Sequence, residues 1–173
     1  MKTLLVITFG LFITYVHGQD KISTKKAKMD HLKHLEGTWS GTGWSMSQDG
    51  TRSEFDQTER ILVKLDGIAM VVEGTGRNKG SEEIAFNALA VFTYDLANEQ
   101  YDIRSYLASG ESTSATGNFV GDNFIWSIIV PGGTVRYTMK ANESTWHEYG
   151  EFSSDGNQWY KFMEMNLSKT TIK

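Results

Sequence analysis

The sequence predicts an all-β fold, an antiparallel up-and-down β-barrel of about ten strands with a short N-terminal helix. Turn-forming residues recur about every ten positions after Thr38, and the segments between them are rich in β-branched and aromatic residues. Connections this short cannot make the crossovers of parallel strands, so we expect consecutive antiparallel hairpins. Closure into a barrel protects the edges of so large a sheet, and we favour it over a two-sheet sandwich.

The first 18 residues have the order of a signal peptide. A basic residue, Lys2, precedes an apolar run from Leu4 to Val16, and a small residue, Gly18, follows. A run of about thirteen residues is too short to span a bilayer, which takes about 20. We therefore expect a secreted or periplasmic protein from which residues 1–18 are removed and which does not insert into a membrane.

The remainder of the chain predicts one domain. Met29, Leu32 and Leu35 recur at helical spacing, and Gly37 offers a helix stop. We expect an N-terminal segment with a short helix at 19–37, a lipocalin-like barrel at 38–168 and a tail at 169–173.

The composition of this domain argues against some classes of binding partner. The chain has 17 Lys and Arg residues against 21 Asp and Glu residues, a formal net charge of -4, which argues against nucleic acid as the main partner. It has no cysteine, so packing alone must hold the fold together. A small hydrophobic molecule is the partner that we expect.

One motif resembles a known group of barrels. The stretch from Gly37 to Gly43, read as Gly-x-Trp-x-Gly-x-Gly, resembles the first strand of calycins, the group of lipocalins and fatty-acid-binding proteins, and also the entry strand of nitrobindins. With Leu65-Asp66-Gly67, Val135-Arg136 and residues 151–165, the chain resembles an uncharacterised bacterial family of lipocalin-like proteins. The resemblance implies the barrel, and it implies no agreed activity. We interpret Trp39 as a structural plug at one end.

The likeness to nitrobindins implies haem, held by a histidine in the last strand. The predicted last strand, 159–167, contains no histidine. Haem therefore needs His147 to point inward, or Met163 or Met165 to replace the histidine. We expect no cofactor, and haem stays an alternative.

An Arg-x-Tyr pair holds the ligand carboxylate in fatty-acid-binding proteins, and this chain has Arg104-Ser105-Tyr106. The opposite face of that strand carries Tyr101 and Ile103 and is more apolar, so we expect Arg104 to face solvent. His31 and His34 lack a third ligand at matched spacing, so we expect no metal site.

The predicted binding residues come from apolar strand faces. Val135, Tyr137 and Met139 share one face, and Phe124, Trp126 and Ile128 share a face of the preceding strand. Together with the one histidine inside the predicted barrel, they give the expected ligand-binding set of Phe124, Trp126, Ile128, Tyr137, Met139 and His147. The leading hypothesis is a non-catalytic binding protein that holds a small, mostly apolar ligand in the barrel.

Two further hypotheses remain open. An enzyme of isomerase or hydratase type could draw its acid and base from His147, Glu148 or Glu164 together with Tyr137. A binding module could instead recognise protein or glycan with the outer face of the barrel. We assign no catalytic residue, because the sequence contains no nucleophile motif or phosphate loop.

Overall fold

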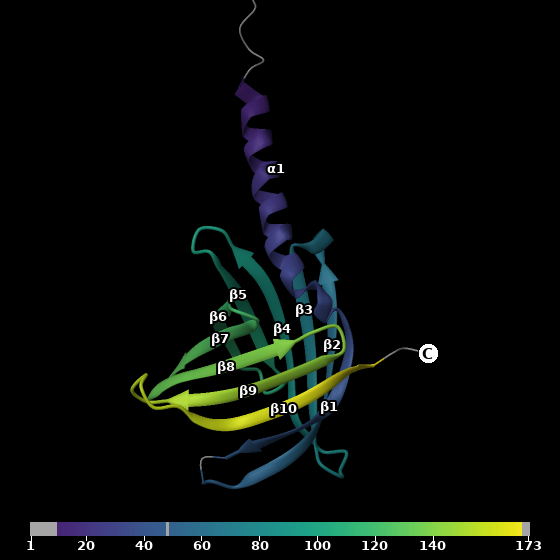
Figure 1. Ribbon diagram of the computed structural model, residues 1–173, viewed down its shortest axis with the longest axis vertical. Helices are drawn as coiled ribbons and strands as arrows, with labels where there is room; N and C mark the ends of the chain where they lie inside the picture. The colour runs from purple at the N-terminus through teal and green to yellow at the C-terminus, as the bar shows by residue number, and fades with distance from the viewer. Residues whose placement is uncertain (1–9, 48, 171–173) are drawn as a thin grey trace, which may run out of the picture.

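The computed structural model describes residues 10–47 and 49–170, which form one α-helix, two short 3-10 helices and ten strands (Figure 1). The helices are α1 Gly10–Met29, η1 Asp30–Leu35 and η2 Leu65–Gly67. The strands are β1 Gly37–Met46, β2 Arg52–Lys64, β3 Ala69–Asn78, β4 Ile84–Asp95, β5 Gln100–Leu107, β6 Ser112–Val120, β7 Asn123–Val130, β8 Gly133–Ala141, β9 Thr145–Ser153 and β10 Tyr160–Thr170.

The ten strands form one closed barrel. Each strand pairs antiparallel with the next one in sequence, and β1 pairs with β10 to complete the circle. Closure leaves no edge strand that could pair with another chain. The predicted antiparallel up-and-down barrel of ten strands is confirmed.

The N-terminal helices cover one end of the barrel. Met29, Leu32 and Leu35 are at most 4% exposed, as their helical spacing predicts, and they join the hydrophobic core. Helix α1 begins at Gly10, earlier than the expected helix, and extends away from the barrel (Figure 1). Within the described residues, no helix is long and apolar enough to cross a membrane. Strand β10 continues to Thr170, so the first two residues of the predicted tail belong to the last strand, and residues 171–173 lie outside the described residues.

Trp39 closes the helix end of the barrel. Its side chain is fully buried, and its Nε1 donates a hydrogen bond to the Leu35 carbonyl oxygen at 2.8 Å. Its ring packs edge to face on Trp146 of β9, with centroids 5.8 Å apart, and the Lys169 ammonium lies 5.1 Å from its centroid. These contacts tie the helix end to β1, β9 and β10, which is the role of a structural plug.

Gly41 allows β1 to lie unusually close to β10. A Cβ atom at Gly41 would lie 2.0 Å from the backbone oxygen of Asn166, closer than any side chain can approach. The glycine therefore lets the first strand coil sharply as the barrel closes.

Candidate binding site in the barrel interior

The interior is tightly packed near the helices and more open at the opposite end. Along β7, Phe124 is 1% exposed, whereas Trp126 and Ile128, which follow it on the inward face, are only partly buried. Along β5, Ile103 is buried and Leu107 is partly buried. The inward side chains thus become accessible toward the end that carries the hairpin loops after β1, β3, β5, β7 and β9.

Two aromatic rings stack face to face in the accessible half. Trp126 of β7 and Tyr137 of β8 are direct partners across the two strands, and their rings stack with centroids 4.0 Å apart at 12°. Phe162 of β10 packs edge to face on Tyr137 at 5.9 Å. Because the two stacked faces cover each other, a planar apolar molecule can contact this pair only at its remaining ring face and edges.

Three polar side chains also point into the barrel. Gln57 and Glu59 of β2 and Glu148 of β9 are 5%, 7% and 5% exposed. The Gln57 Nε2 donates to Glu59 Oε1 at 2.7 Å, and the Trp146 Nε1 donates to Glu148 Oε2 at 2.9 Å. Among the side chains that the structure describes, residues 19–47 and 49–170, no Lys, Arg or His forms an ion pair with either carboxyl.

Burial shifts the titration of these groups. Loss of solvation raises the pKa of Glu148 to about 7, against hydrogen bonds from Trp146 and Trp126 that lower it. Loss of solvation also raises the pKa of Glu59 to about 7; the Gln57 hydrogen bond opposes this rise, and the charge of Glu148 adds to it. Burial, and then the Glu148 charge, raise the pKa of Tyr137 to about 12. The two carboxyls therefore exchange protons near neutral pH.

Gln57 and Glu59 are not recognisable as interior residues from the sequence. Both carry polar side chains on a strand whose outer face is polar too, so alternation alone does not show which face is inward. A usable signal lies on β3, where a Cβ atom at Gly74 would lie 2.8 Å from both carboxyl oxygens of Glu59. A glycine directly opposite a glutamate on the neighbouring strand marks the space that the carboxyl fills.

Five of the six predicted binding residues point inward, and they form two groups. Trp126, Ile128 and Tyr137 point into the accessible half of the barrel. Phe124 and Met139 also point inward, but they are 1% and 6% exposed and belong to the packed core.

His147 is a correction, because it lies on the outer face. Its neighbours Trp146 and Glu148 point inward, so strand alternation sends the imidazole outward, where its Nε2 lies 2.8 Å from Glu164 Oε1. The carboxyl of Glu164 has its pKa lowered mainly by this hydrogen bond. His147 therefore cannot line the interior.

This placement also divides the acid and base groups that the sequence suggested. Glu148 and Tyr137 lie inside the barrel, whereas His147 and Glu164 lie outside. A histidine ligand for haem is not present inside the barrel among the described residues, because His31, His34 and His147 all lie outside it. Of the two methionines named as replacements, Met165 is packed in the core and Met163 is partly buried beside it. In the described part of the chain, no three His, Cys, Asp or Glu side chains are placed to hold a metal ion.

Arg104 faces solvent, as expected from the apolar character of the opposite face of β5. The guanidinium donates to the Ser114 hydroxyl at 3.0 Å on the outer surface. It is therefore not placed to hold a ligand carboxylate inside the barrel.

Replacing His147 should have little effect. We expect His147→Gln to change the free energy of unfolding by less than about 1 kcal/mol, because exposed polar pairs contribute little. Urea denaturation followed by circular dichroism measures this change. If this variant also lost the binding of a small molecule inside the barrel, that result would contradict the outward placement of the imidazole.

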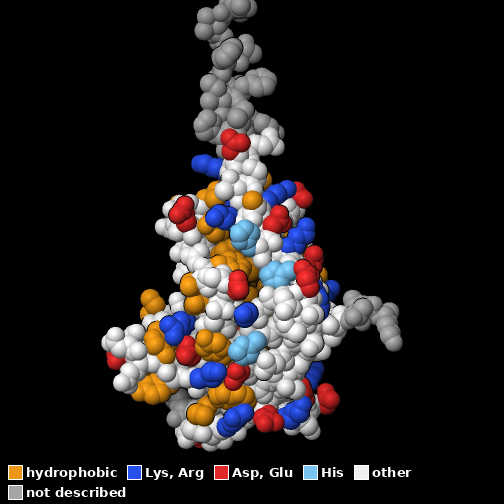
Figure 2. Space-filling view, in the orientation of Figure 1, with side chains coloured by type: hydrophobic (Ala, Val, Ile, Leu, Met, Phe, Trp, Pro, Cys, Tyr) orange, Lys and Arg blue, Asp and Glu red, His pale blue; other side chains and the backbone are white. Residues whose placement is uncertain are grey.

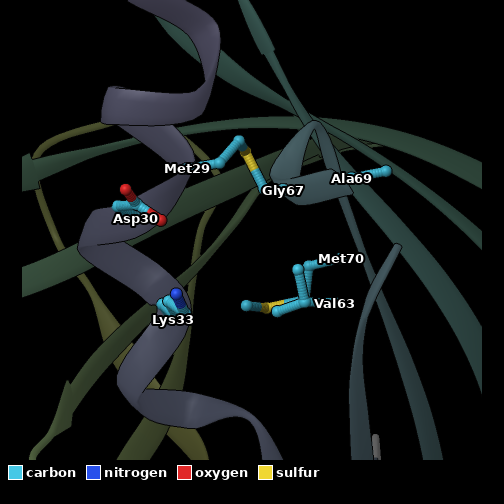
Figure 3. Close-up of a pocket in the computed structure, with 7 residues that line it drawn as sticks. All are labelled: Met29, Asp30, Lys33, Val63, Gly67, Ala69 and Met70. Carbon is cyan, nitrogen blue, oxygen red and sulfur yellow. The ribbon is translucent and has the colours of Figure 1, made fainter. Parts of the chain in front are cut away.

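A small cleft lies at the helix end and is too small for a ligand. Figure 3 shows its lining residues, which come from the three helices α1, η1 and η2 and from strands β2 and β3: Met29, Asp30, Lys33, Val63, Gly67, Ala69 and Met70. Its volume is about 10 Å³, which is about the space of one water molecule.

The outer surface in Figure 2 carries acidic and basic side chains scattered among hydrophobic ones. The basic side chains on the outer face include Arg136, which pairs with Glu151 at 2.8 Å and lies 3.7 Å over the Trp159 ring. The hydrophobic side chains on the face in view are interrupted by charges, which gives the outer-face hypothesis no support there.

Comparison with solved structures shows the same fold. The barrel is similar to Rv2717c from Mycobacterium tuberculosis, with a TM-score of 0.66 and 10% identity over 83% of this chain and 97% of that chain. It is also similar to the S-type phycobiliprotein lyase CPES from Guillardia theta, with a TM-score of 0.60 and 8% identity over 83% and 92%. No protein-family model and no curated protein matches the chain. At identities this low, the comparison establishes the shared barrel fold alone.

Proposed function

We propose that this calycin-like barrel is a non-catalytic binding protein that holds a small, mostly apolar molecule in the half of the barrel opposite the helices. The observation that carries the proposal is the change in exposure along the inward strand faces, from the sealed Trp39 end to the partly open surface of Trp126 and Tyr137. A barrel with only a structural role has no need of an accessible aromatic surface next to buried carboxyls. The similarity to a phycobiliprotein lyase is compatible with small-molecule binding.

Titration with a neutral fluorescent probe, N-phenyl-1-naphthylamine, tests this proposal. We expect saturable binding that Ala88→Trp weakens about tenfold or more, because Ala88 faces inward between Gly74 and Leu107 and the indole would fill the site. Its outward neighbour Asn87 supplies the matched control, and Asn87→Trp should bind like the original protein. Absence of binding, or equal binding by the two variants, would overturn the proposal.

Export is part of the same proposal. The order of residues 1–18 supports a signal peptide that is removed before the protein acts outside the cytoplasm. N-terminal sequencing of protein purified from its own source should find a chain that starts near Gln19. A mature chain that retains Met1 would contradict export by this route.

Acid–base catalysis on a small hydrophobic substrate is the second candidate. It is favoured by one observation, the placement of Glu148 close enough to Tyr137 for its charge to raise the pKa of the phenol. Native mass spectrometry of protein from its own source distinguishes the two functions. A ligand that is released unchanged supports binding, and one converted on incubation supports catalysis.

A further inference from the structure

We infer that the interior site takes an organic cation, which presents a protonated nitrogen to Glu59 and Glu148 and a flat apolar body to Trp126 and Tyr137. This inference rests on the proposed binding function and names the chemical class of its ligand.

The two buried carboxyls lack a partner of opposite charge among the described side chains, which favours a cationic ligand. Both carboxyls are more than nine-tenths buried, and within the described residues neither has a basic partner. A buried carboxylate is costly unless a cation or several hydrogen bonds compensate it. The two residues come from β2 and β9, so closure of the barrel brings the two acidic groups close enough for their charges to interact. A ligand cation would supply the charge that the protein lacks.

The hydrogen bonds of the two carboxyls also favour a ligand that donates a hydrogen bond. Glu59 Oε1 accepts from Gln57, and Glu59 Oε2 has no donor among the described side chains. Glu148 accepts from Trp146 at Oε2 and also receives a hydrogen bond from Trp126. In the same part of the chain, no buried side-chain oxygen is both sealed from solvent and unpaired. The free oxygen of Glu59 is therefore not sealed from solvent, and a ligand donor can reach it.

The aromatic pair beside Glu148 also favours a cation. Trp126 stacks on Tyr137, and a hydrogen bond from Trp126 contributes to the environment of Glu148. A ligand nitrogen that reaches Glu148 thus lies beside the indole, and a cation is attracted to the face of an aromatic ring. An anion would meet two carboxyls and the negative faces of the rings. Charge complementarity favours an amine or amidine over a neutral or acidic ligand of equal shape.

Binding should release protons. Near neutral pH the empty site holds protons on its carboxyls, and a cation favours their ionised forms. The affinity for a cation should therefore rise from pH 5.5 to pH 8, by up to about tenfold per pH unit for each proton released. A neutral molecule of the same shape should show no such increase.

Three naphthalene probes of similar size test the inference by isothermal titration calorimetry: 1-naphthylmethylamine as cation, 1-naphthylmethanol as neutral molecule and 1-naphthoate as anion. At pH 8 we expect the amine to bind about tenfold or more tightly than the alcohol, with the anion weakest. Titrations in buffers of different ionisation enthalpy should show that only the amine releases protons.

Isosteric variants locate the effect. Glu59→Gln and Glu148→Gln should each weaken amine binding about tenfold at pH 8 and leave alcohol binding within about threefold. The matched control is Glu54→Gln, an exposed glutamate on the outer face of β2, which should bind all three probes like the original protein. If one interior variant does not fold, the other variant and the proton release measured on the original protein still test the inference.

The outcomes separate the two proposals. Alcohol binding as tight as amine binding at pH 8, with no proton release, would overturn the cation inference and leave the proposed binding function standing. A preference for the anion would overturn it as well. Failure of all three probes and of the neutral fluorescent probe to bind would overturn the binding function itself.

Discussion

Between pH 5 and pH 8, the ligand-free protein should lose about 2 to 3 kcal/mol of unfolding free energy for each of its two buried carboxyls. Glu59 and Glu148 have pKa values of about 7 in the folded protein, against an ordinary value of 4.5. A raised folded pKa means that the folded state binds the proton more tightly. The stability from this proton is therefore fully present below pH 4.5 and is lost as the pH rises through about 7.

Urea denaturation at several pH values measures this loss. Glu59→Gln and Glu148→Gln should each flatten the decline by about half, because glutamine is neutral throughout and has nearly the same shape. The exposed control Glu54→Gln should keep the full decline. A free energy of unfolding that is constant or increases from pH 5 to pH 8 would contradict the burial of two uncompensated carboxyls.

Trp39→Ala should lower the free energy of unfolding by about 3 to 5 kcal/mol, the usual cost of removing a large buried aromatic side chain. The substitution leaves a cavity at the helix end, removes the hydrogen bond to the Leu35 oxygen and removes the packing on Trp146. For a domain of this size we expect the melting temperature to fall by roughly 10 °C.

Trp44 supplies the matched control on the same strand. It lies on the outer face of β1, partly buried beneath Arg52, whose guanidinium is 4.3 Å from the ring centroid. We expect Trp44→Ala to lower the free energy of unfolding by about 1 kcal/mol. Both variants can be compared by urea denaturation. Equal losses would mean that Trp39 does not act as the plug.

The sequence by itself determined the barrel fold and the approximate number of its strands. Turn residues and alternation predicted ten strands, and the spacing of Met29, Leu32 and Leu35 predicted the covering helix. These signals are local: a turn or a strand face depends on residues within a few positions of each other. Trp39 was interpretable for a similar reason, because its motif marks the first strand.

Only the tertiary structure decided which polar residues enter the barrel. His147 and Glu148 are neighbours in sequence, and a register change of one residue would exchange their positions, so alternation between two polar faces could not choose. Glu59 and Glu148 lie on strands that are not adjacent, and they interact only because the sheet closes. The interior acidic site is therefore a product of barrel closure, which places side chains by long-range packing that no local pattern records.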